Sequence, residues 1–388
     1  MHAILALDKF KGTFSAQEAC ELVARGIRKR NPKVISTIIP MADGGEGTAE
    51  LIASKLGMEA FVVTVPDWNG TQTKSCIYWD NKQRVALVES ATVLGLESPL
   101  GKQPIQENAL FQSNSFALGK LIQKALELRP IELWIAIGGT LTADAGWGLA
   151  TALGVTAQDF SGNILYPCLE NMEKITSISL KGELSEALQR TRVRALCDVN
   201  APAAPVSTIS LASFLPQKGA TPAAIPLIEK RITHLWKQLQ AYSRPTLDLE
   251  KAGTGAGGGL CLGLSSVFPN LHIELGAERL ARVNNLAAHI AQANVVVCGE
   301  GCLDDQTFYG KAPTIVSKLG KKANVPVFGI FGQYSGKINI MKEKLDAKNI
   351  HFLFEKLPHT HTELIRQSEL RLIETGVAIA HWLETSAL

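Results

Sequence analysis

Three turns that combine glycine, carboxylates and lysine are the parts of this 388-residue sequence best suited to chemistry. They occupy residues 8–13, 41–48 and 299–313, and each follows a short apolar run and precedes a helical pattern. Turns of this kind lie at the carboxyl edge of a parallel sheet, where open α/β folds bind their ligands. Glycine amides at a helix N-terminus bind anions, carboxylates bind Mg²⁺, and lysine neutralises phosphate. The combination therefore predicts phosphate chemistry.

The charged residues of these turns, and two further aspartates, are the candidates for catalysis and metal binding. The candidate metal ligands are carboxylates of the turns: Asp8, Asp43 and Asp304. The candidates for neutralising phosphate or a substrate carboxylate are the lysines of the turns: Lys9, Lys11 and Lys311. Asp198 follows an apolar run, so either Asp198 or Asp43 is expected to accept the proton of a substrate hydroxyl. Asp144, the only charge in a further glycine-rich turn at residues 138–146, is also a catalytic candidate.

Glycines in the same turns are the candidates for contacting a nucleotide. Residues 44–47 hold three glycines in four positions, a composition that is costly if it serves chain reversal alone. The candidate nucleotide contacts are Gly44, Gly45, Gly47, Gly253, Gly255, Gly257, Gly299 and Glu300. Residues 253–258 match the dinucleotide pattern Gly-x-Gly-x-x-Gly, but no buried strand is expected before them. A loop that packs closely or wraps an anion is therefore favoured over a dehydrogenase.

Composition and missing motifs exclude several other classes of protein. The net charge is only +3 and no long basic run occurs, so binding to nucleic acid is not implied. No apolar stretch is long enough to span a membrane, and the first residues read as a strand rather than a signal peptide. The seven cysteines include no Cys-x-x-Cys pair, which indicates buried thiols in a reducing cytoplasm. Neither a P-loop nor a Gly-x-Ser-x-Gly elbow is present, which excludes P-loop enzymes and hydrolases of that type.

The order of apolar runs in the first part of the chain predicts an α/β fold. Strands are expected at residues 4–7, 34–39 and 60–65, separated by helices that begin near Ser15 and Thr48. This β-α-β-α-β order predicts a parallel sheet with right-handed crossovers.

The alternation of parallel strands and helices is interrupted near residue 66, which predicts an inserted domain. Two strand-like stretches at residues 74–79 and 84–89 read as a hairpin, and alternating strands and helices return near residue 295. We therefore expect one domain made of residues 1–66 plus 288–388, and a second α/β domain at residues 67–287 inserted into it.

Taken together, these turns resemble those of the bacterial glycerate kinase family. The matching segments cover nearly the whole chain: residues 8–16, 40–48, 89–91, 138–148, 197–199, 216–220, 253–260 and 299–313. The resemblance implies two α/β domains, one flavodoxin-like and the other resembling a restriction-endonuclease core inserted into it. It also implies ATP-dependent phosphorylation of D-glycerate with Mg²⁺, usually at the 2-hydroxyl, which would give 2-phosphoglycerate.

Three positions differ from the pattern of that family. Ala143 stands where the family usually has asparagine, Ala201 where it has the proline of Asn-Pro-Leu, and Cys302 where it has arginine. The loss of arginine removes a bidentate anion-binding group, so the identity of the acid stays open. The alternatives are a kinase of another small hydroxy acid and a non-catalytic descendant that binds a nucleotide or sugar acid. The oligomeric state also stays open, with a homodimer as one option.

Overall fold

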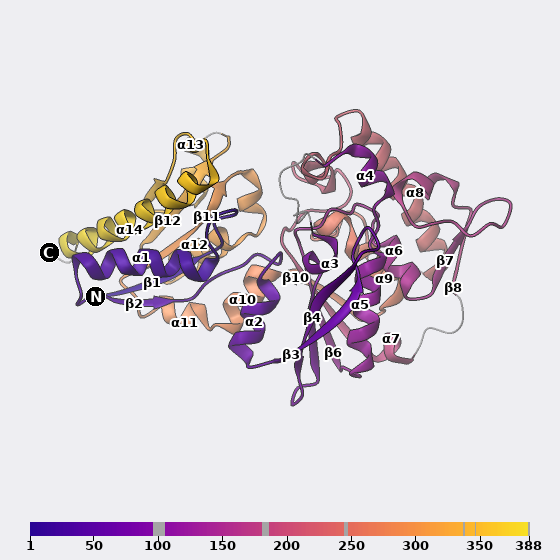
Figure 1. Cartoon of the computed structure of the whole chain (residues 1–388), viewed down its shortest axis with the longest axis horizontal. Coiled ribbons are helices and arrows are strands. Elements are labelled where there is room, and N and C mark those ends of the chain that lie inside the picture. The colour runs from indigo at the N-terminus through magenta and orange to yellow at the C-terminus, as the bar shows by residue number, and fades with distance from the viewer. Residues whose placement is uncertain (96–104, 181–185, 244–246, 337, 346, 387–388) are drawn as a thin grey trace. The chain divides into compact units, whose positions relative to one another are not determined.

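The computed structural model describes residues 1–95, 105–180, 186–243, 247–336, 338–345 and 347–386 (Figure 1). The chain forms two compact units. The first unit comprises Met1–Asp43 and Ala277–Leu388, and the second unit comprises Gly44–Gly276. Both are α/β, as the sequence predicted. Among the described helices, none has the length and apolarity that a bilayer crossing requires.

The first unit is built on a five-stranded parallel sheet. Its strands, in spatial order, are β13 (Asn349–Phe352), β12 (Val327–Tyr334), β11 (Val295–Leu303), β1 (His2–Leu7) and β2 (Ile35–Ile38). All four pairings are parallel. Counted along the unit, the order is 2-1-3-4-5, which is the flavodoxin-like order expected from the family resemblance.

Helices cover both faces of this sheet. Helices α1 (Ala16–Arg30) and α14 (His361–Ser386) lie side by side on one face (Figure 1). Alternate residues of β1, including Leu5 and Leu7, enter a core shared with these two helices. Helix α12 (Ala312–Lys322) packs on the other face, where a Cβ on Gly320 would lie 3.1 Å from Cγ1 of Val296. The remaining helices of this unit are α10 (Gly276–Val283), α11 (Leu286–Ile290), α13 (Ile338–Leu345) and the 3₁₀ helix η5 (Asp305–Tyr309).

Helix α1 begins where the sequence predicted a capping box. The Glu18 amide donates to Oγ of Ser15 at 3.3 Å, and the Ser15 amide donates to Oε2 of Glu18 at 2.8 Å. These bonds satisfy two amides that the helix itself leaves unpaired, and so fix the residue at which the loop after β1 ends.

The second unit contains a six-stranded mixed sheet. In spatial order its strands are β10 (Leu271–Leu275), β9 (Arg192–Cys197), β6 (Glu132–Ile137), β5 (Val85–Glu89), β4 (Gln72–Asp80) and β3 (Glu59–Pro66). The first four are parallel, whereas β4 runs antiparallel to both β5 and β3. Strands β7 (Val155–Gln158) and β8 (Ser177–Leu180) form a separate antiparallel pair. The hairpin predicted from the sequence is thus β4–β5.

Helices of the second unit connect and cover these strands. They are α2 (Thr48–Leu56), α3 (Ala91–Leu94), α4 (Glu107–Gln112), α5 (Phe116–Glu127), α6 (Trp147–Ala152), α7 (Glu186–Arg190), α8 (Ala224–Ser243) and α9 (Leu260–Val267). Four 3₁₀ turns complete the described elements: η1 (Leu169–Lys174), η2 (Leu211–Phe214), η3 (Pro216–Lys218) and η4 (Ala256–Gly258).

One predicted pairing is wrong, and it moves the boundary of the inserted unit. The strand expected at residues 60–65 does not join the first sheet; it is β3, the antiparallel edge strand of the second sheet. The chain therefore enters the second unit after Asp43 rather than near residue 66, and leaves it at residue 277 rather than 288. The local pattern of a helix followed by a strand is the same in both cases. The partner of β3 is chosen by the tight turn to β4, in which the Asp67 amide donates to the Thr71 carbonyl at 2.8 Å.

Candidate functional site

The acidic turns of the first unit meet at the centre of its sheet. The chain runs from β1 outward to β2 on one side, whereas β11, β12 and β13 extend to the other side. The gap between β1 and β11 is thus the topological switch point, where open α/β sheets bind ligands. Leu7 pairs with Gly299, and the Asp8 amide donates to the Gly299 carbonyl at 2.9 Å. This register places Asp8 beside Glu300 at the carboxyl edge.

Three carboxylates at this edge repel one another. The side chains of Asp8 and Glu300 are only 5% and 7% exposed. Burial raises the pKa of Asp8 well above its usual value, and the negative charges of Asp43 and Glu300 raise it further. Burial also raises the pKa of Glu300 to about 7, although Lys311 and a hydrogen bond from Thr307 oppose the shift. The edge therefore concentrates negative charge in a place where water screens it poorly.

Lys311 lies between two of the acids. Its Nζ is 3.9 Å from Oε2 of Glu300 and 3.9 Å from Oδ1 of Asp304. The Thr307 hydroxyl donates to Oε1 of Glu300 at 2.7 Å, and the Thr307 amide donates to Oδ1 of Asp304 at 3.0 Å. Asp304 caps η5, and Lys311 is the residue before the first turn of α12. These caps fix the backbone that carries both charges.

The two lysines of the first turn flank Asp8. Lys9 is half-buried and Lys11 is exposed, and the Lys9 amide donates to Oδ1 of Asp8 at 2.6 Å. The loop is closed by an isolated bridge between Phe10 and Phe14. A Cβ on Gly301 would lie 3.1 Å from the Lys11 amide nitrogen, so the loop runs close beside β11. The structure thus brings these lysines to the edge that holds the predicted metal ligands.

The donor atoms at this edge suit a hard cation without forming a finished metal site. Within the described residues, no three His, Cys, Asp or Glu side chains gather as a ready set of ligands. Mg²⁺ in nucleotide enzymes takes one or two carboxylates and completes its shell with phosphate oxygens and water. One or two of the predicted ligands Asp8, Asp43 and Asp304 would meet that requirement, and Glu300 is a further carboxylate at this edge that the sequence placed among nucleotide contacts.

In the second unit, three predicted turns converge on Asp198. A Cβ on Gly138 would lie 2.7 Å from Cα of Gly45 and 2.9 Å from Cβ of Asp198. Gly44 has φ +124°, and a Cβ there would lie 2.8 Å from the Cys197 carbonyl carbon. Glycine is required at residues 44 and 138 because the turn before α2 and the turns after β6 and β9 approach one another so closely. Asp198 is half-buried at this meeting point.

The amides at the N-terminus of α2 already bind a carboxylate of the protein itself. The amides of Gly47 and Ala49 donate to the Glu89 carboxylate at 3.1 and 3.0 Å. The Gly44 amide donates to Oγ1 of Thr48 at 3.0 Å. A helix N-terminus favours negative charge, and the buried Glu89 supplies it. Two of the glycine amides predicted to bind phosphate therefore have partners within the protein, and Glu89 is a residue that the site prediction missed.

Asp144 is part of the scaffold. It is completely buried and accepts hydrogen bonds from the Ser115 amide and hydroxyl, both at 2.8 Å. The amides of Gly146 and Gly148 also donate to it, at 3.3 and 2.8 Å. Burial raises the pKa of Asp144, and these hydrogen bonds lower it. The carboxylate of this catalytic candidate ties the start of α5 to the start of α6.

The glycine-rich loop at residues 253–259 packs against other backbone. A Cβ on Gly258 would lie 2.0 Å from the Thr142 carbonyl oxygen, and one on Gly255 would lie 2.4 Å from the Pro202 carbonyl oxygen. Gly253 and Gly257 have positive φ and pack on isoleucine side chains. The described residues 247–252 include no strand, which agrees with the rejection of a dinucleotide fold. The structure thus explains these glycines by packing, as it does Gly299, whose Cβ would lie 1.8 Å from the Ile330 carbonyl oxygen.

Lys218 is a second buried charge that the site prediction missed. Its side chain is 3% exposed, and its Nζ donates to the carbonyls of Thr140 and Thr142 at 2.5 and 2.8 Å. A third bond joins Nζ to Oγ1 of Thr140 at 3.1 Å. Burial lowers the pKa of Lys218 to about 8, against the opposing attraction of Asp198 and Asp144. The only signal in the sequence was the match of residues 216–220 to the family pattern.

The three positions that depart from the family pattern have different surroundings. Ala143 and Ala201 are completely buried, and the Ala201 carbonyl accepts a hydrogen bond from the Gly255 amide at 2.9 Å. Cys302 is half-buried in β11, where burial and the charges of Asp304 and Glu300 raise the pKa of its thiol to about 11. A neutral side chain therefore occupies a position two residues from Glu300.

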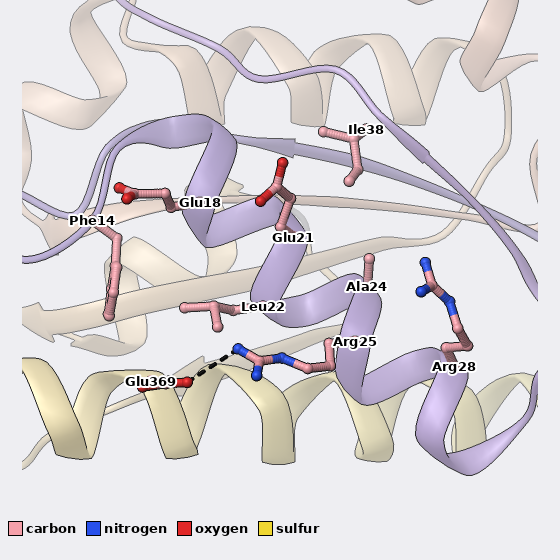
Figure 2. A pocket seen from close by; sticks show the side chains of 9 residues that line it. All are labelled: Phe14, Glu18, Glu21, Leu22, Ala24, Arg25, Arg28, Ile38 and Glu369. Carbon is pink, nitrogen blue, oxygen red and sulfur yellow. Dashed lines mark hydrogen bonds and ion pairs between the residues drawn. The ribbon is translucent and has the colours of Figure 1, made fainter.

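A groove on the first unit lies apart from these charges. Figure 2 shows it along α1. Its volume is about 500 Å³. The residues that line it are Phe14, Glu18, Glu21, Leu22, Ala24, Arg25, Arg28, Ile38 and Glu369. Arg25 and Glu369 form an exposed ion pair across it at 3.0 Å. None of the candidate catalytic or metal-binding residues lines this groove.

Comparisons with known proteins agree along the whole chain. Residues 3–384 match the sequence pattern of the glycerate kinase family. A glycerate kinase from Haemophilus influenzae is 28% identical over 388 residues, which is 99% of each chain. A glycerate 2-kinase from Escherichia coli is 31% identical over 345 residues, 88% of each chain. The crystal structure of glycerate kinase 2 from Salmonella typhimurium superposes with a TM-score of 0.74 at 28% identity, covering 100% of this chain and 99% of that one.

Proposed function

Since the chain belongs to the glycerate kinase family, we propose that it transfers the terminal phosphoryl group of ATP to the 2-hydroxyl of D-glycerate, giving 2-phosphoglycerate. The family and its relatives make the protein a kinase with a small-molecule substrate. ATP as donor, Mg²⁺ as cofactor and the 2-hydroxyl as acceptor are the finer parts of the proposal.

The observation that carries the proposal is the crowding of acids at the switch point of the first unit. Phosphoryl transfer depends mainly on positioning and on neutralising the charge of the phosphates. Asp8 and Glu300 are buried beside Asp43, although their charges repel one another. Such an arrangement is costly unless a cation binds there, and perturbed carboxylates of this kind cluster at functional sites.

We assign separate roles to the charged residues of this edge. Asp8, Asp43 and Asp304 would hold Mg²⁺, which when bound neutralises phosphate oxygens. Lys9, Lys11 and Lys311 would neutralise phosphate or the substrate carboxylate. Lys311 is held between Glu300 and Asp304 at 3.9 Å from each, so it is already oriented before a ligand arrives.

The proton of the substrate hydroxyl needs an acceptor. Asp43 and Asp198 are both half-buried carboxylates at the ends of turns, and we propose one of them as the base. Asp144 is assigned to positioning, because its carboxylate is completely buried and accepts four hydrogen bonds from its own unit.

A second candidate substrate is a different small hydroxy acid. Cys302 occupies a position where the family carries arginine, and it lies close to Glu300 in β11. Without arginine, this position lacks a planar guanidinium group that can bind a carboxylate through two parallel hydrogen bonds. This observation favours an acid that is held by fewer cationic contacts than D-glycerate is in relatives with the arginine.

A coupled assay of ADP release tests the proposal. The purified chain would be supplied with MgATP and, in turn, D-glycerate, L-glycerate and tartronate, and the product would be identified by ³¹P NMR. We expect turnover with D-glycerate, a 2-phospho product, and loss of activity when Mg²⁺ is removed. Turnover with another acid alone would support the second candidate. Calorimetric binding of nucleotide without any turnover would show a non-catalytic descendant and would overturn the proposal.

A further inference from the structure

Lys218 has no donor left for a ligand. An ammonium group carries three N–H donors. The three acceptors at Nζ are the carbonyl oxygens of Thr140 and Thr142 and the hydroxyl of Thr140. All belong to one turn that follows β6, some 78 residues earlier in the chain. In a kinase, a lysine is usually interpreted as a phosphate contact. Lys218 could bind phosphate only by breaking its hydrogen bonds to this turn.

The charge of Lys218 faces two carboxylates from different parts of the second unit. Asp198, which follows β9, and Asp144, at the start of α6, both attract it. Burying an ammonium group without such partners would be strongly unfavourable. The side chain thus holds the turn after β6 and places a positive charge near Asp198, one of the two candidates for the base.

The turn that Lys218 holds is also the turn that packs on Asp198. Gly138, at its start, lies so close to Asp198 that an added Cβ would be 2.9 Å from the Cβ of that residue. The Thr142 carbonyl, at its other end, lies against Gly258, and the Leu141 amide donates to the Leu94 carbonyl at 2.8 Å. Loss of the hydrogen bonds to Thr140 and Thr142 would therefore let this turn move, and the turn would no longer restrict the position of Asp198.

We propose that Lys218 is a positioning residue for phosphoryl transfer. It clamps the Thr140–Thr142 segment and so fixes the orientation of Asp198, and it touches neither substrate. This role rests on the proposed function, because it presupposes that Asp198 takes part in the reaction. It differs from a phosphate-binding role in leaving the affinity for ATP unchanged.

Steady-state kinetics of Lys218→Met on the full chain test the proposal. Methionine keeps the length of the side chain but loses the charge and all three hydrogen bonds. We expect kcat to fall on the order of 10²-fold, as for other small misplacements of reacting groups. The KM values for MgATP and D-glycerate should stay near those of the wild type, because Lys218 contacts neither substrate and the misplaced Asp198 is needed only when the hydroxyl proton is transferred.

A matched control separates this effect from general loss of stability. Leu235→Ala empties a fully buried position of α8 in the same unit and should lower the melting temperature without lowering kcat per folded molecule. If Lys218→Met does not fold, Lys218→Gln, whose neutral amide keeps two of the three N–H donors, is measured in its place. A large rise in the KM for MgATP with kcat unchanged would overturn the proposal, because it would show a ligand contact. So would a loss of kcat that Leu235→Ala reproduces.

Hydrogen exchange supplies a readout that does not depend on turnover. In Lys218→Met the amides of residues 138–148 should exchange faster than in the wild type, while those of α8 should not change. Unchanged exchange at residues 138–148 would overturn the clamp. If the wild type shows no turnover with any acid, the proposed function fails by itself, and exchange still decides whether Lys218 holds the turn.

Discussion

At the sheet edge of the first unit, Asp8 and Glu300 are buried beside Asp43 and their charges oppose one another. At the sheet edge of the second unit, Glu89 accepts two backbone hydrogen bonds and Lys218 donates three bonds to one turn. Both edges bury charge at the ends of parallel strands. The second edge meets its charges with several hydrogen bonds to backbone, whereas at the first edge Glu300 is met by the Thr307 hydroxyl and, at 3.9 Å, by Lys311.

The difference separates two uses of a buried charge. A charge whose bonds are complete holds backbone in place and gains nothing from a ligand. A carboxylate buried against other carboxylates carries a cost that a bound cation would remove. We therefore assign metal and phosphate binding to the first edge, and the alignment of turns to the second.

The sharpest test of the first edge is Asp43→Asn. The change is nearly isosteric in a half-buried turn, so folding should be almost unaffected. Turnover should fall on the order of 10²–10⁴-fold if Asp43 is the base. If Asp43 is only a metal ligand, raising the Mg²⁺ concentration should restore part of the rate. Kinetics and thermal unfolding of one purified variant decide this, and normal kinetics at every Mg²⁺ concentration would remove Asp43 from the site.

The matching test of the second edge is Asp144→Ala. It would remove the acceptor of the Gly146, Gly148 and Ser115 amides and of the Ser115 hydroxyl, and leave Lys218 with one carboxylate fewer. We expect the free energy of unfolding to fall by about 3–5 kcal/mol, the usual cost of removing one partner of a buried charged network. Asp159→Ala, which removes a similar but solvent-facing turn carboxylate, serves as the control and should change stability far less. Equal losses in the two variants would contradict the assignment of Asp144 to the scaffold.

Glu300→Gln should change stability in a pH-dependent way. The pKa of Glu300 is raised by burial to about 7 in the folded protein, from 4.5. The folded state therefore binds more protons than the unfolded state between these values, and stability falls as pH rises through this window. The destabilisation caused by ionising the buried Glu300 is absent below pH 4.5 and fully present above pH 7.

The variant should therefore be more stable than the wild type at pH 8, by at most about 3 kcal/mol, and equally stable near pH 4.5. Melting temperatures of both proteins across this range, in the absence of divalent cations, measure the difference. A difference that does not change with pH would show that the charge of Glu300 carries no such cost.

The smallest effect is expected at the groove of Figure 2. Arg25 and Glu369 are 59% and 42% exposed, and exposed ion pairs contribute little. Arg25→Ala should lower stability by about 0.5 kcal/mol or less and leave turnover unchanged. A clear loss of turnover in this variant would mean that the groove, and not only the acidic edge, serves the reaction.

Local features of the fold could be predicted from the sequence. The capping box of α1 and the β4–β5 hairpin depend on residues that are close in the chain, and both are confirmed. The pairing of β3 could not be predicted, because the same helix-strand order fits either sheet. All three turns were expected at the carboxyl edge of a parallel sheet, and the pairing of Leu7 with Gly299 places the first turn and the one at residues 299–313 at the same edge.

The residues missed at the site are those whose role depends on distant partners. Lys218 is defined by a turn 78 residues away, and Glu89 by amides about 40 residues away. In sequence each is a single charge next to an apolar run, which is also how many surface residues look. Distant partners also explain a glycine: Gly255, predicted as a nucleotide contact, lies so close to the Pro202 carbonyl oxygen that a Cβ would be 2.4 Å from it.

The discontinuity of the first unit has a consequence for synthesis on the ribosome. Strand β1 lies inside its sheet, between β2 and β11, yet β11 is made about 290 residues later. At roughly 5–20 residues per second, β1 and the apolar face of α1 wait on the order of 15–60 s for that partner. The second unit is one continuous stretch of chain and can complete its sheet during this interval. Nascent chains stalled before residue 295 should therefore protect the second unit from proteolysis while β1 and α1 remain bound by chaperones.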